Sequence, residues 1–569
     1  MEFTTDLQGG KPRTAPSEPA WKQRLSRNVD KMRKEIDILN GFVSGKLKRR
    51  AGMKYAQAVM KKYHTNGDKK EIVKLIFILK NKVSVVTTKL RRYLTQEKSK
   101  RQNDMFDKNR KQFYRDIETE AKFAIPTPPS EDDLREFWGI RIFGQADLYN
   151  PDAEWIPQWR SEYDGVSEQE WSDLNAHDLA NQLGRQLNWK APGIDLVPNY
   201  WLKTLTAAHK PLVNALNECV VRPQLLPQWM VTGRTTLLAK NAQTDKAKNF
   251  RPITCLTTSW KTLTGMLATR IERHLENNGI LAHEQQGGRG GSYGTKQQLI
   301  INKTVLEHAI KYRRNLSITY IDFMKAYDSV PHPWILETLK TYKVSNVITN
   351  FLKHAMGMWQ IKLILRHDSG MMEVPNIKIQ RGIFQGDTLS PLLFIIAINP
   401  LSFLLNKSGM GYDMDGVKFS HMIYMDDIKT FSGSIKGNQE MIKIMYNFSN
   451  TIGMAFGIDK CKVLNITRGK HTNHEGVTLP NGEVIEEMGE EDVYKYLGVI
   501  ESTGIKHEKM KEKVLTTFKK RVKSILKTEL NSKNIMISMG EYAIPVISYT
   551  YGVINWTEAE MPTSTFANS

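Results

Sequence analysis

The sequence predicts an α+β protein with a basic helical extension at its N-terminus. Hydrophobic residues recur at helical spacing near the N-terminus, residues 316–323 form a β-rich run typical of a strand, and residues 421–433 form a pattern typical of a β-hairpin. Hydrophobic residues make up 40% of the 569 and charged residues 25%, which is the composition of a globular protein with a real core.

Residues 1–123 are the predicted basic helical extension. Two hydrophobic stripes with a spacing of three and four residues predict two amphipathic helices that share a seam. Residues 1–120 hold 30 Lys and Arg against 14 Asp and Glu, a net charge of +16, so we expect this extension to bind the phosphate backbone of RNA. A solvated helix face would also account for such charge. The stripes consist of Val29, Met32, Ile36, Leu39 and Val43, and of Ile72, Leu75, Ile76, Leu79, Val83, Val86 and Leu90.

Residues 124–180 are predicted to be an acidic linker or docking segment. Residues 121–180 hold 13 acidic and 4 basic side chains, and the segment opens with the proline-rich run AIPTPPSEDD. It also contains Trp138, Trp155, Trp159 and Trp171, which form no recognisable chemical motif. We expect these rings to dock on the domain that follows.

The overall composition narrows the class of partner. The net charge of +21 and a pI of about 9.5 indicate that the binding partner is a polyanion. Cys219, Cys255 and Cys461 lie far apart, which excludes a disulfide framework and a CxxC zinc site. The longest apolar run, 392–398, is too short to span a bilayer and predicts a buried helix or strand. The acidic and polar residues at the start of the sequence lead us to expect no secretion signal.

Three aspartates are the candidate catalytic groups. Asp322 lies at the end of the β-rich run, and Asp426 and Asp427 lie at the tip of the predicted hairpin. If the hairpin lies antiparallel beside the first strand, the three carboxylates come together and repel one another unless a cation such as Mg²⁺ neutralises them. Aspartate pairs are also common in hairpin turns for their backbone hydrogen bonds, so the pair alone leaves both interpretations open.

These runs, taken in order, resemble the successive motifs of reverse transcriptases. Among reverse transcriptases, the motifs most resemble those of LINE-type, non-long-terminal-repeat retrotransposons. Within that group, the sequence is most similar to the branch that carries a restriction-enzyme-like endonuclease at its C-terminus. The resemblance covers roughly residues 180–560. Because the sequence ends soon after this region, we expect the chain to be a copy of the element's protein that is truncated after the thumb. The matching runs are WKAPGIDLVP (189–198), KNFRPITCLTTSWK (248–261), EQQGGRGGSYGTKQQL (284–299), LSITYIDFMKAYDSVPH (316–332), QRGIFQGDTLSPLLF (380–394), YMDD (424–427), GMAFGIDKCKVL (453–464) and YKYLG (494–498).

The resemblance implies a right-hand polymerase fold and an activity. Fingers and palm are expected at 181–504, the thumb at 505–560 and a tail at 561–569. The implied activity is RNA-directed DNA polymerase, which extends the 3′-hydroxyl of a DNA primer or target DNA on an RNA template, with dNTPs as substrates. Two Mg²⁺ ions are the implied cofactors, with Mn²⁺ as a substitute. A retroelement protein of this kind is expected in the nucleus and the cytoplasm, without membrane attachment.

The resemblance also assigns roles to individual residues. Asp322, Asp426 and Asp427 would be the catalytic acids and metal ligands, with the main-chain carbonyl of Phe323 as a further ligand. The implied nucleotide-binding residues are Arg251, Arg289, Tyr327, Gln385, Gly386 and Lys460, and Tyr327 would exclude a ribose 2′-hydroxyl. The thumb residues expected to follow the nucleic-acid backbone are Lys519, Lys520, Arg521, Lys523 and Lys527, on a helix whose other face carries Met510, Val514, Phe518, Val522 and Ile525.

Two other interpretations stay open at the level of the sequence. The chain could be a catalytically inactive or domesticated nucleic-acid-binding remnant of a retrotransposon, or an RNA-directed RNA polymerase, which shares the chemistry of the palm. Lys460 could be an exposed strand lysine instead of a proton donor to pyrophosphate. Primer extension with dNTPs against rNTPs, beside a binding assay, separates these cases.

Overall fold

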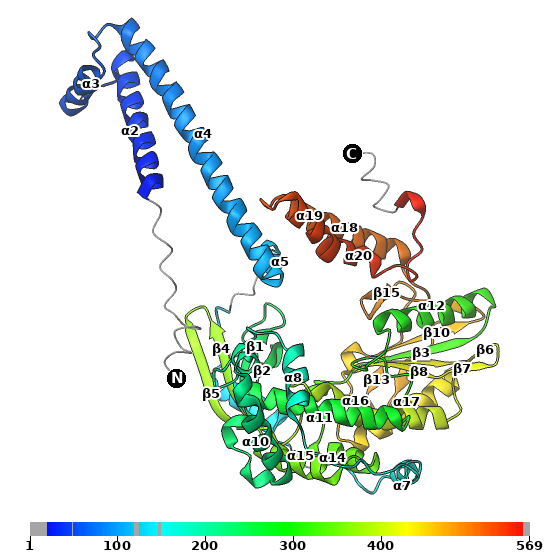
Figure 1. The fold of residues 1–569 in the computed structure, drawn as a ribbon. Helices are drawn as coiled ribbons and strands as arrows, with labels where there is room; N and C mark the ends of the chain where they lie inside the picture. Colours follow the sequence, from blue (N-terminus) through cyan, green and yellow to red (C-terminus); the bar gives the residue numbers. More distant parts are fainter. Residues whose placement is uncertain (1–19, 48, 119–124, 146–148, 561–569) are drawn as a thin grey trace. The chain divides into compact units, whose positions relative to one another are not determined.

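The protein consists of two compact units in a computed structural model. One unit comprises residues 1–120 and 512–549, and the other comprises residues 121–511 and 550–569. The structure describes residues 20–47, 49–118, 125–145 and 149–560 (Figure 1). The predicted tail at 561–569 lies outside the described residues.

The N-terminal helices of the first unit pack through the predicted seam. They are α2 (Ala20–Val43), α3 (Arg50–Lys62) and α4 (Lys69–Lys108). Ile36 and Leu39 of α2, Val59 of α3, and Ile72 and Leu79 of α4 are buried in one hydrophobic cluster, which confirms the helical stripes. The third helix, α3, adds a buried edge that the stripes alone do not predict.

A second cluster of the same unit joins the end of the extension to the predicted thumb. Phe106 and Phe113, from α4 and α5, are buried against Leu530, and the ring of Tyr114 stacks on that of Tyr542 with centroids 4.7 Å apart. Two segments from distant parts of the sequence therefore form one helical unit. The helices of this part are α5 (Arg110–Ile117), α18 (His507–Leu526), which crosses between the two units, α19 (Ser532–Ser538) and α20 (Ile544–Ser548).

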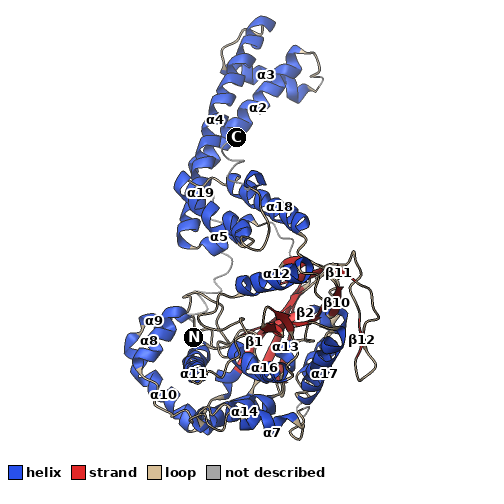
Figure 2. Cartoon of the chain, turned by 90° about the vertical axis from the view of Figure 1, so that its right-hand side faces the viewer, coloured by secondary structure: helices blue, strands red, loops and turns tan. Residues whose placement is uncertain are grey.

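A five-stranded antiparallel sheet carries the predicted catalytic runs in the second unit. Its strand order is β11-β10-β3-β9-β8, so the predicted hairpin, β8 and β9, lies antiparallel beside the predicted first strand, β3. Figure 2 shows the strands of this unit in red, with helices around them. The strands are β3 (Leu316–Ile321), β8 (His421–Tyr424), β9 (Asp427–Ser432), β10 (Lys462–Thr467) and β11 (Lys470–His471).

A four-stranded sheet and several small hairpins complete the strands of the second unit. The four-stranded sheet has the order β2-β1-β4-β5, with β1 antiparallel to β2 and parallel to β4. Its strands are β1 (Thr232–Ala239), β2 (Phe250–Cys255), β4 (Gln360–His367) and β5 (Gly370–Lys378). The small hairpins are β6 (Tyr412–Met414) with β7 (Val417–Phe419), β12 (Val477–Thr478) with β13 (Val484–Ile485), and β14 (Tyr494–Tyr496) with β15 (Val499–Glu501).

Helices bury the hydrophobic faces of these sheets. The apolar run at 392–398 lies in α16, whose residues are mostly buried, so it is a core helix. By length and composition α16 is also the one helix among the described residues that could cross a membrane, and 72% of it is buried inside the protein. The helices are α6 (Glu131–Leu134), α7 (Trp155–Ser161), α8 (Ala176–Arg185), α9 (Asn199–Thr204), α10 (His209–Val221), α11 (Thr258–Asn277), α12 (Thr295–Lys311), α13 (Ala326–Ser329), α14 (His332–Thr341), α15 (Asn346–Met358), α16 (Ser390–Lys407) and α17 (Ile435–Thr451).

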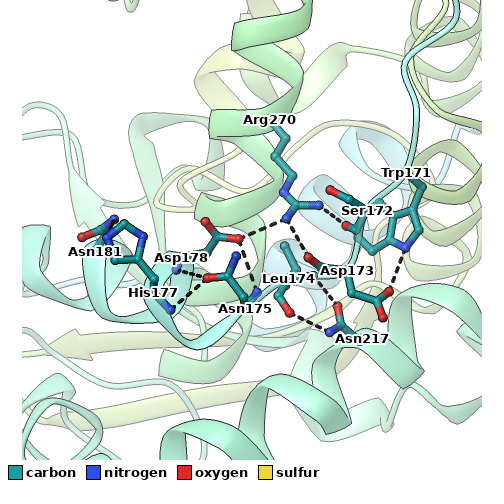
Figure 3. Close-up of polar contacts among 10 residues, drawn as sticks. All are labelled: Trp171, Ser172, Asp173, Leu174, Asn175, His177, Asp178, Asn181, Asn217 and Arg270. Atoms are coloured by element: carbon teal, nitrogen blue, oxygen red, sulfur yellow. Dashed lines mark hydrogen bonds and ion pairs between the residues drawn. The ribbon is translucent and has the colours of Figure 1, made fainter.

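The acidic, aromatic segment belongs to the core of the second unit. Trp138 and Trp159 are fully buried in the main hydrophobic cluster, and Trp155 packs against it. Further along, Arg270 of α11 donates hydrogen bonds to the main-chain oxygens of Ser172 and Asp173 and pairs with Asp178 (Figure 3). In its described residues this segment therefore docks on the rest of the unit, through buried rings between Trp138 and Trp159 and through Arg270 further along.

Candidate active site

The register of the five-stranded sheet brings Asp322 and Asp427 together at one end of the sheet, and the hairpin turn holds Asp426 next to them. Ile321, the last residue of β3, lies opposite Ile428 of β9. Asp322 follows Ile321 and Asp427 precedes Ile428, so the two aspartates lie at the same end of the paired strands. Asp426 precedes β9 in the turn of the hairpin. The hairpin, its antiparallel placement and the proximity of the acids were all expected from the sequence.

A tight turn presents Asp426, and a neighbouring loop fixes that turn. Met425 adopts a left-handed conformation with φ of 57°, and its main-chain N–H donates to the side-chain oxygen of Gln285 over 3.1 Å. The same oxygen accepts from the N–H of Gly287, where a Cβ would lie 2.6 Å from the main-chain nitrogen of Met425. Only glycine allows this approach, so the glycine-rich loop at 287–294 supports the hairpin directly.

The acids influence one another electrostatically. Burial raises the pKa of Asp427 to about 6, with further increases from the negative charges of Asp426 and Asp322. Burial and Asp322 also raise the pKa of Asp426. Among the described residues, no group of three or more Asp, Glu, His or Cys side chains lies close enough together to hold a metal ion.

Lys460 lies directly against the first acid. Its Nζ is 2.6 Å from Oδ2 of Asp322, and its side chain is 69% exposed. The segment before Lys460 also lies close to Asp322, because the N–H of Gly457 donates to the main-chain oxygen of Asp322 over 2.7 Å. The exposed ammonium is thus held beside the acids and can meet a phosphate or donate a proton there.

A second lysine, which the sequence did not suggest, joins this cationic group. Lys240 follows β1 and Arg251 lies in β2, and the pairing of Leu238 with Arg251 puts the two basic side chains on one face of the hairpin. Burial and the charges of Arg251 and Lys460 lower the pKa of Lys240, whereas Asp328 and Asp322 raise it. A lone lysine after a strand gives no sequence signal, and only the register reveals its neighbours.

A cavity of about 1020 Å³ opens beside Asp322. Its basic lining residues are Arg141, Lys240, Lys248, Lys325, Arg381 and Lys460. Asp322, Asp328, Asp459 and Glu483 also line it, so basic side chains outnumber acidic ones six to four around the cavity. Such a cavity suits a polyphosphate, because it neutralises charge on the phosphates while the acids stay available for a cation.

The ring of Tyr327 lies near the acids and is held by a stacking contact. Its ring stacks on Phe394 of α16, with centroids 5.0 Å apart and planes 6° from parallel. Burial and the charge of Asp426 raise its pKa, so the hydroxyl stays neutral. A ring fixed in this way can exclude a sugar substituent by contact.

The loop that carries Gln385 and Gly386 packs between β2 and α13. The amide of Gln385 donates to Oδ1 of Asp328 over 2.9 Å, and the N–H of Thr254 donates to the main-chain oxygen of Gln385. Gly386 has φ of 131°, and a Cβ there would lie 2.4 Å from the main-chain oxygen of Thr254. The glycine is therefore required by geometry, and Gln385 is oriented by the buried carboxylate of Asp328.

Asp387, which follows Gly386 in the loop, connects the loop to α11. Its two carboxylate oxygens accept from the indole N–H of Trp260 over 3.1 Å and from the hydroxyl of Thr264 over 2.6 Å. Burial raises the pKa of Asp387, and these hydrogen bonds oppose that effect. These two hydrogen bonds restrain the backbone of the loop that carries Gln385 and Gly386.

The structure gives two of the predicted arginines other partners. The guanidinium of Arg289 donates to the main-chain oxygen of Ala282 over 2.9 Å and lies 3.6 Å from Glu276, so it supports its own loop. Arg521 of α18 donates to the main-chain oxygen of Tyr542 over 2.8 Å and lies over the Tyr542 ring. None of these contacts joins Arg289 or Arg521 to Asp322, Asp426 or Asp427.

The other predicted thumb residues keep their side chains exposed. They are Lys519, Lys520 and Lys523 of α18, and Lys527 directly after it. Met510, Val514, Phe518, Val522 and Ile525 are buried, so the amphipathic pattern expected for this helix is confirmed. The exposed lysines form the polar side of the helix, as a backbone-binding surface requires.

Comparisons with known proteins agree with this site. Residues 239–500 match the family described as reverse transcriptase (RNA-dependent DNA polymerase). The chain is 26% identical over 337 residues to the Pol polyprotein of the retrotransposable element R2DM from Drosophila melanogaster, covering 58% of this chain and 30% of that protein. It is 26% identical over 305 residues to the R2 Pol polyprotein of Nasonia vitripennis, covering 50% of this chain and 28% of that protein.

The chain thus spans less than a third of the length of these curated relatives. Among solved structures, apo telomerase from Candida tropicalis aligns with 12% identity and a TM-score of 0.33, over 49% of this chain and 54% of that one. The assignment rests on the sequence matches, not on this loose alignment. The predicted kinship with a branch that carries a C-terminal endonuclease stays a prediction. Residues 239–500 therefore match the reverse transcriptase family, and about half of the chain is similar to the Pol polyproteins of R2 retrotransposable elements.

Proposed function

We propose that this chain is the RNA-directed DNA polymerase of a non-long-terminal-repeat retrotransposon, which extends a DNA 3′-hydroxyl on an RNA template. The observation that carries the proposal is the convergence of Asp322, Asp426 and Asp427 at one end of β3 and β9, beside a cation-lined cavity. Acids that repel one another next to a polyphosphate-sized basic cavity suit nucleotidyl transfer better than simple binding.

The acids have the donor chemistry for divalent cations. Asp322, Asp426 and Asp427, with the main-chain carbonyl of Phe323, would hold two Mg²⁺ ions, for which Mn²⁺ can substitute. When bound, such ions neutralise phosphate charge and activate the attacking hydroxyl. The fit is supported by the raised pKa of Asp427, because a site that disfavours crowded negative charge gains most from a hard cation.

Basic residues around the acids would bind the incoming dNTP. Lys240, Arg251 and Lys460 would contact its phosphates, and Lys460 is close enough to the acidic centre to protonate the leaving pyrophosphate. Gln385 and Gly386 would contact the nucleotide and template. Arg289 would also bind the nucleotide, from the loop that its hydrogen bond to the main-chain oxygen of Ala282 supports.

Tyr327 would select deoxynucleotides. Its ring is stacked on Phe394 and cannot yield without leaving that contact, so a 2′-hydroxyl would meet a fixed wall. The exposed lysines at 519, 520, 523 and 527 would hold the template–primer duplex by its phosphates, and the N-terminal extension would bind RNA.

Primer extension by the purified chain tests this proposal. We expect dNTP incorporation on an RNA template with Mg²⁺ or Mn²⁺, and Tyr327→Ala should accept rNTPs far better than the wild type does. Filter binding of the same RNA runs in parallel. Binding without extension under both metals would instead indicate a catalytically inactive remnant, and a strong rNTP preference in the wild type would indicate an RNA polymerase.

A further inference from the structure

A polar cavity of about 600 Å³ lies between α8, α11 and the loop at 167–175, with Ile348 of α15 in its lining. None of its lining residues belongs to the runs that resemble reverse transcriptase motifs, and none lines the cavity beside Asp322. The proposed polymerase activity therefore gives this cavity no role.

Contacts between its walls fix the shape of the cavity. Arg270 of α11 pairs with Asp178 of α8 over 3.0 Å, and its guanidinium lies over the ring of Trp171, 5.2 Å from the centroid (Figure 3). The main-chain oxygen of Arg270 accepts a hydrogen bond from the side-chain amide of Gln169 over 3.0 Å. The two helices and the loop are tied together in this way, so a ligand would enter a preformed site.

Gln182 of α8 is a buried polar side chain in the lining of the cavity. It is 8% exposed, and among the described residues its side-chain amide has no hydrogen-bond partner. Gly265 of α11 makes room for this amide, because a Cβ there would lie 1.9 Å from the amide nitrogen. A buried amide without a partner and a glycine inside a helix each destabilise a fold. A ligand that forms hydrogen bonds with Gln182 would account for both features.

The charge of the lining is balanced, and two of its arginines are available to a ligand. Arg185 of α8 and Arg273 of α11 are exposed and form no ion pair with any described residue. Of the three acids in the lining, one pairs with Arg270, and Glu168 and Glu170 balance the other two arginines in formal charge. Such a lining suits a ligand whose larger part is uncharged and that carries a phosphodiester, which a guanidinium fork binds well.

Amide side chains supply most of the other polar groups of the cavity. An amide offers a donor and an acceptor side by side, which is the pattern that binds the edge of a nucleobase. Trp171 and the guanidinium of Arg270 add flat faces, and unpaired bases stack on such faces. The amides are those of Gln169, Asn175, Asn181, Gln182, Asn277 and Asn278.

We infer that this cavity binds one unpaired nucleotide of a single-stranded nucleic acid. The base lies among the amides, with Gln182 bonded to its edge, and the adjoining phosphates lie on Arg185 and Arg273. RNA and DNA both offer this chemistry. The site does not include the three aspartates, so the inference goes beyond the proposed polymerase function and does not depend on it.

Photo-cross-linking of the full chain to a short single-stranded RNA that carries 4-thiouridine tests the inference. Mass spectrometry of the cross-linked peptides separates this cavity from the other nucleic-acid-binding surfaces of the chain. We expect cross-links within 167–185 or 266–278 in the absence of dNTPs. A wild type with no cross-link in these ranges would overturn the inference.

Paired and DNA strands define the ligand further. The same RNA annealed to its complement should lose these cross-links, because a paired base is not free to enter the cavity; an equal yield from the duplex would overturn the inference. A DNA strand of the same sequence with 4-thiothymidine identifies the source. Cross-links from both strands would show that base and phosphate suffice, and cross-links from one strand alone would assign the site to RNA or to DNA.

Two variants test the role of the buried amide. Gly265→Ala pushes the amide of Gln182 into the cavity, while alanine favours the helix. We expect the yield in the cavity, relative to cross-links elsewhere on the chain, to fall at least tenfold with no loss of melting temperature. Gln182→Met removes the amide and keeps the length of the side chain, and it should lower the same yield at least tenfold. An undiminished yield in either variant would overturn the inference.

A matched pair of double variants tests the arginines. Arg185→Gln with Arg273→Gln should lower the yield in the cavity at least fivefold. Lys407→Gln with Lys436→Gln removes the same charge from exposed positions of α16 and α17, and it should leave that yield within twofold of the wild type. Equal losses in the two would show that net charge attracts the strand, and would overturn the inference.

Discussion

Replacement of the buried Asp328 should make the protein more stable and the polymerase slower. Burial raises the pKa of Asp328 from 3.8 to about 6, although Lys325 and the hydrogen bond from Gln385 oppose the effect. The folded state therefore disfavours the ionised carboxylate at neutral pH. Asp328→Asn removes that charge and keeps a side-chain oxygen that can accept from Gln385.

The size of the effect follows from the pKa. The difference between 3.8 and about 6 is about two pH units, and at about 1.4 kcal/mol for each unit the ionised Asp328 costs about 3 kcal/mol of folding free energy. Because the pKa in the folded state lies above that in the unfolded state, the stabilising contribution is complete below about pH 4 and is lost as the pH rises through about 6. About 3 kcal/mol is an upper value for the gain, since Lys325 loses its acidic neighbour.

Urea unfolding of the wild type and of Asp328→Asn at about pH 7.5 and about pH 4 measures this difference. We expect the variant to be more stable by about 2–3 kcal/mol at the higher pH and nearly equal at the lower pH. Its primer extension should slow, because a neutral acceptor orients Gln385 less strongly than a carboxylate. A variant that is less stable at pH 7.5, or whose gain is the same at both pH values, would refute the reasoning.

Two other substitutions test the rest of the site. Gly386→Ala would place a Cβ 2.4 Å from the main-chain oxygen of Thr254, so the loop must move, and we expect at least a tenfold loss of extension with little change in RNA binding; wild-type rates would show that the loop tolerates displacement. Lys240→Met should raise the KM for dNTP about tenfold and change the rate at saturation far less, because under the proposed function the lysine would contact the phosphates; a steady-state titration of dNTP decides, and an unchanged KM would exclude the lysine from the nucleotide site.

The parts of the site that the sequence predicts are those encoded in local runs. A strand that ends at Asp322 and a hairpin that ends at Asp426 and Asp427 can each be read from a few residues, because the alternation of side chains and the turn are local properties. Antiparallel pairing of the strand and the hairpin is the condition under which the acids come together, and the structure shows this pairing.

The parts that the sequence does not predict depend on distant pairs. Lys429 and Glu501 each look like an ordinary charged residue of a strand, and only the folded hairpin reveals that they neutralise each other at 0% exposure. Lys240 gains its meaning from the register of β1 and β2. Tyr114 and Tyr542 stack although they come from the extension and the thumb, so the two predicted domains share a compact unit that periodicity cannot show.

Primer extension by the wild type and by Asp426→Asn is the most direct test of the central claim. Asn keeps the size of the side chain but removes the charge that a divalent cation needs, so the variant should lose extension by several orders of magnitude and bind the RNA template–primer as the wild type does. Near-normal extension by Asp426→Asn would contradict the assignment of the three aspartates as the catalytic centre.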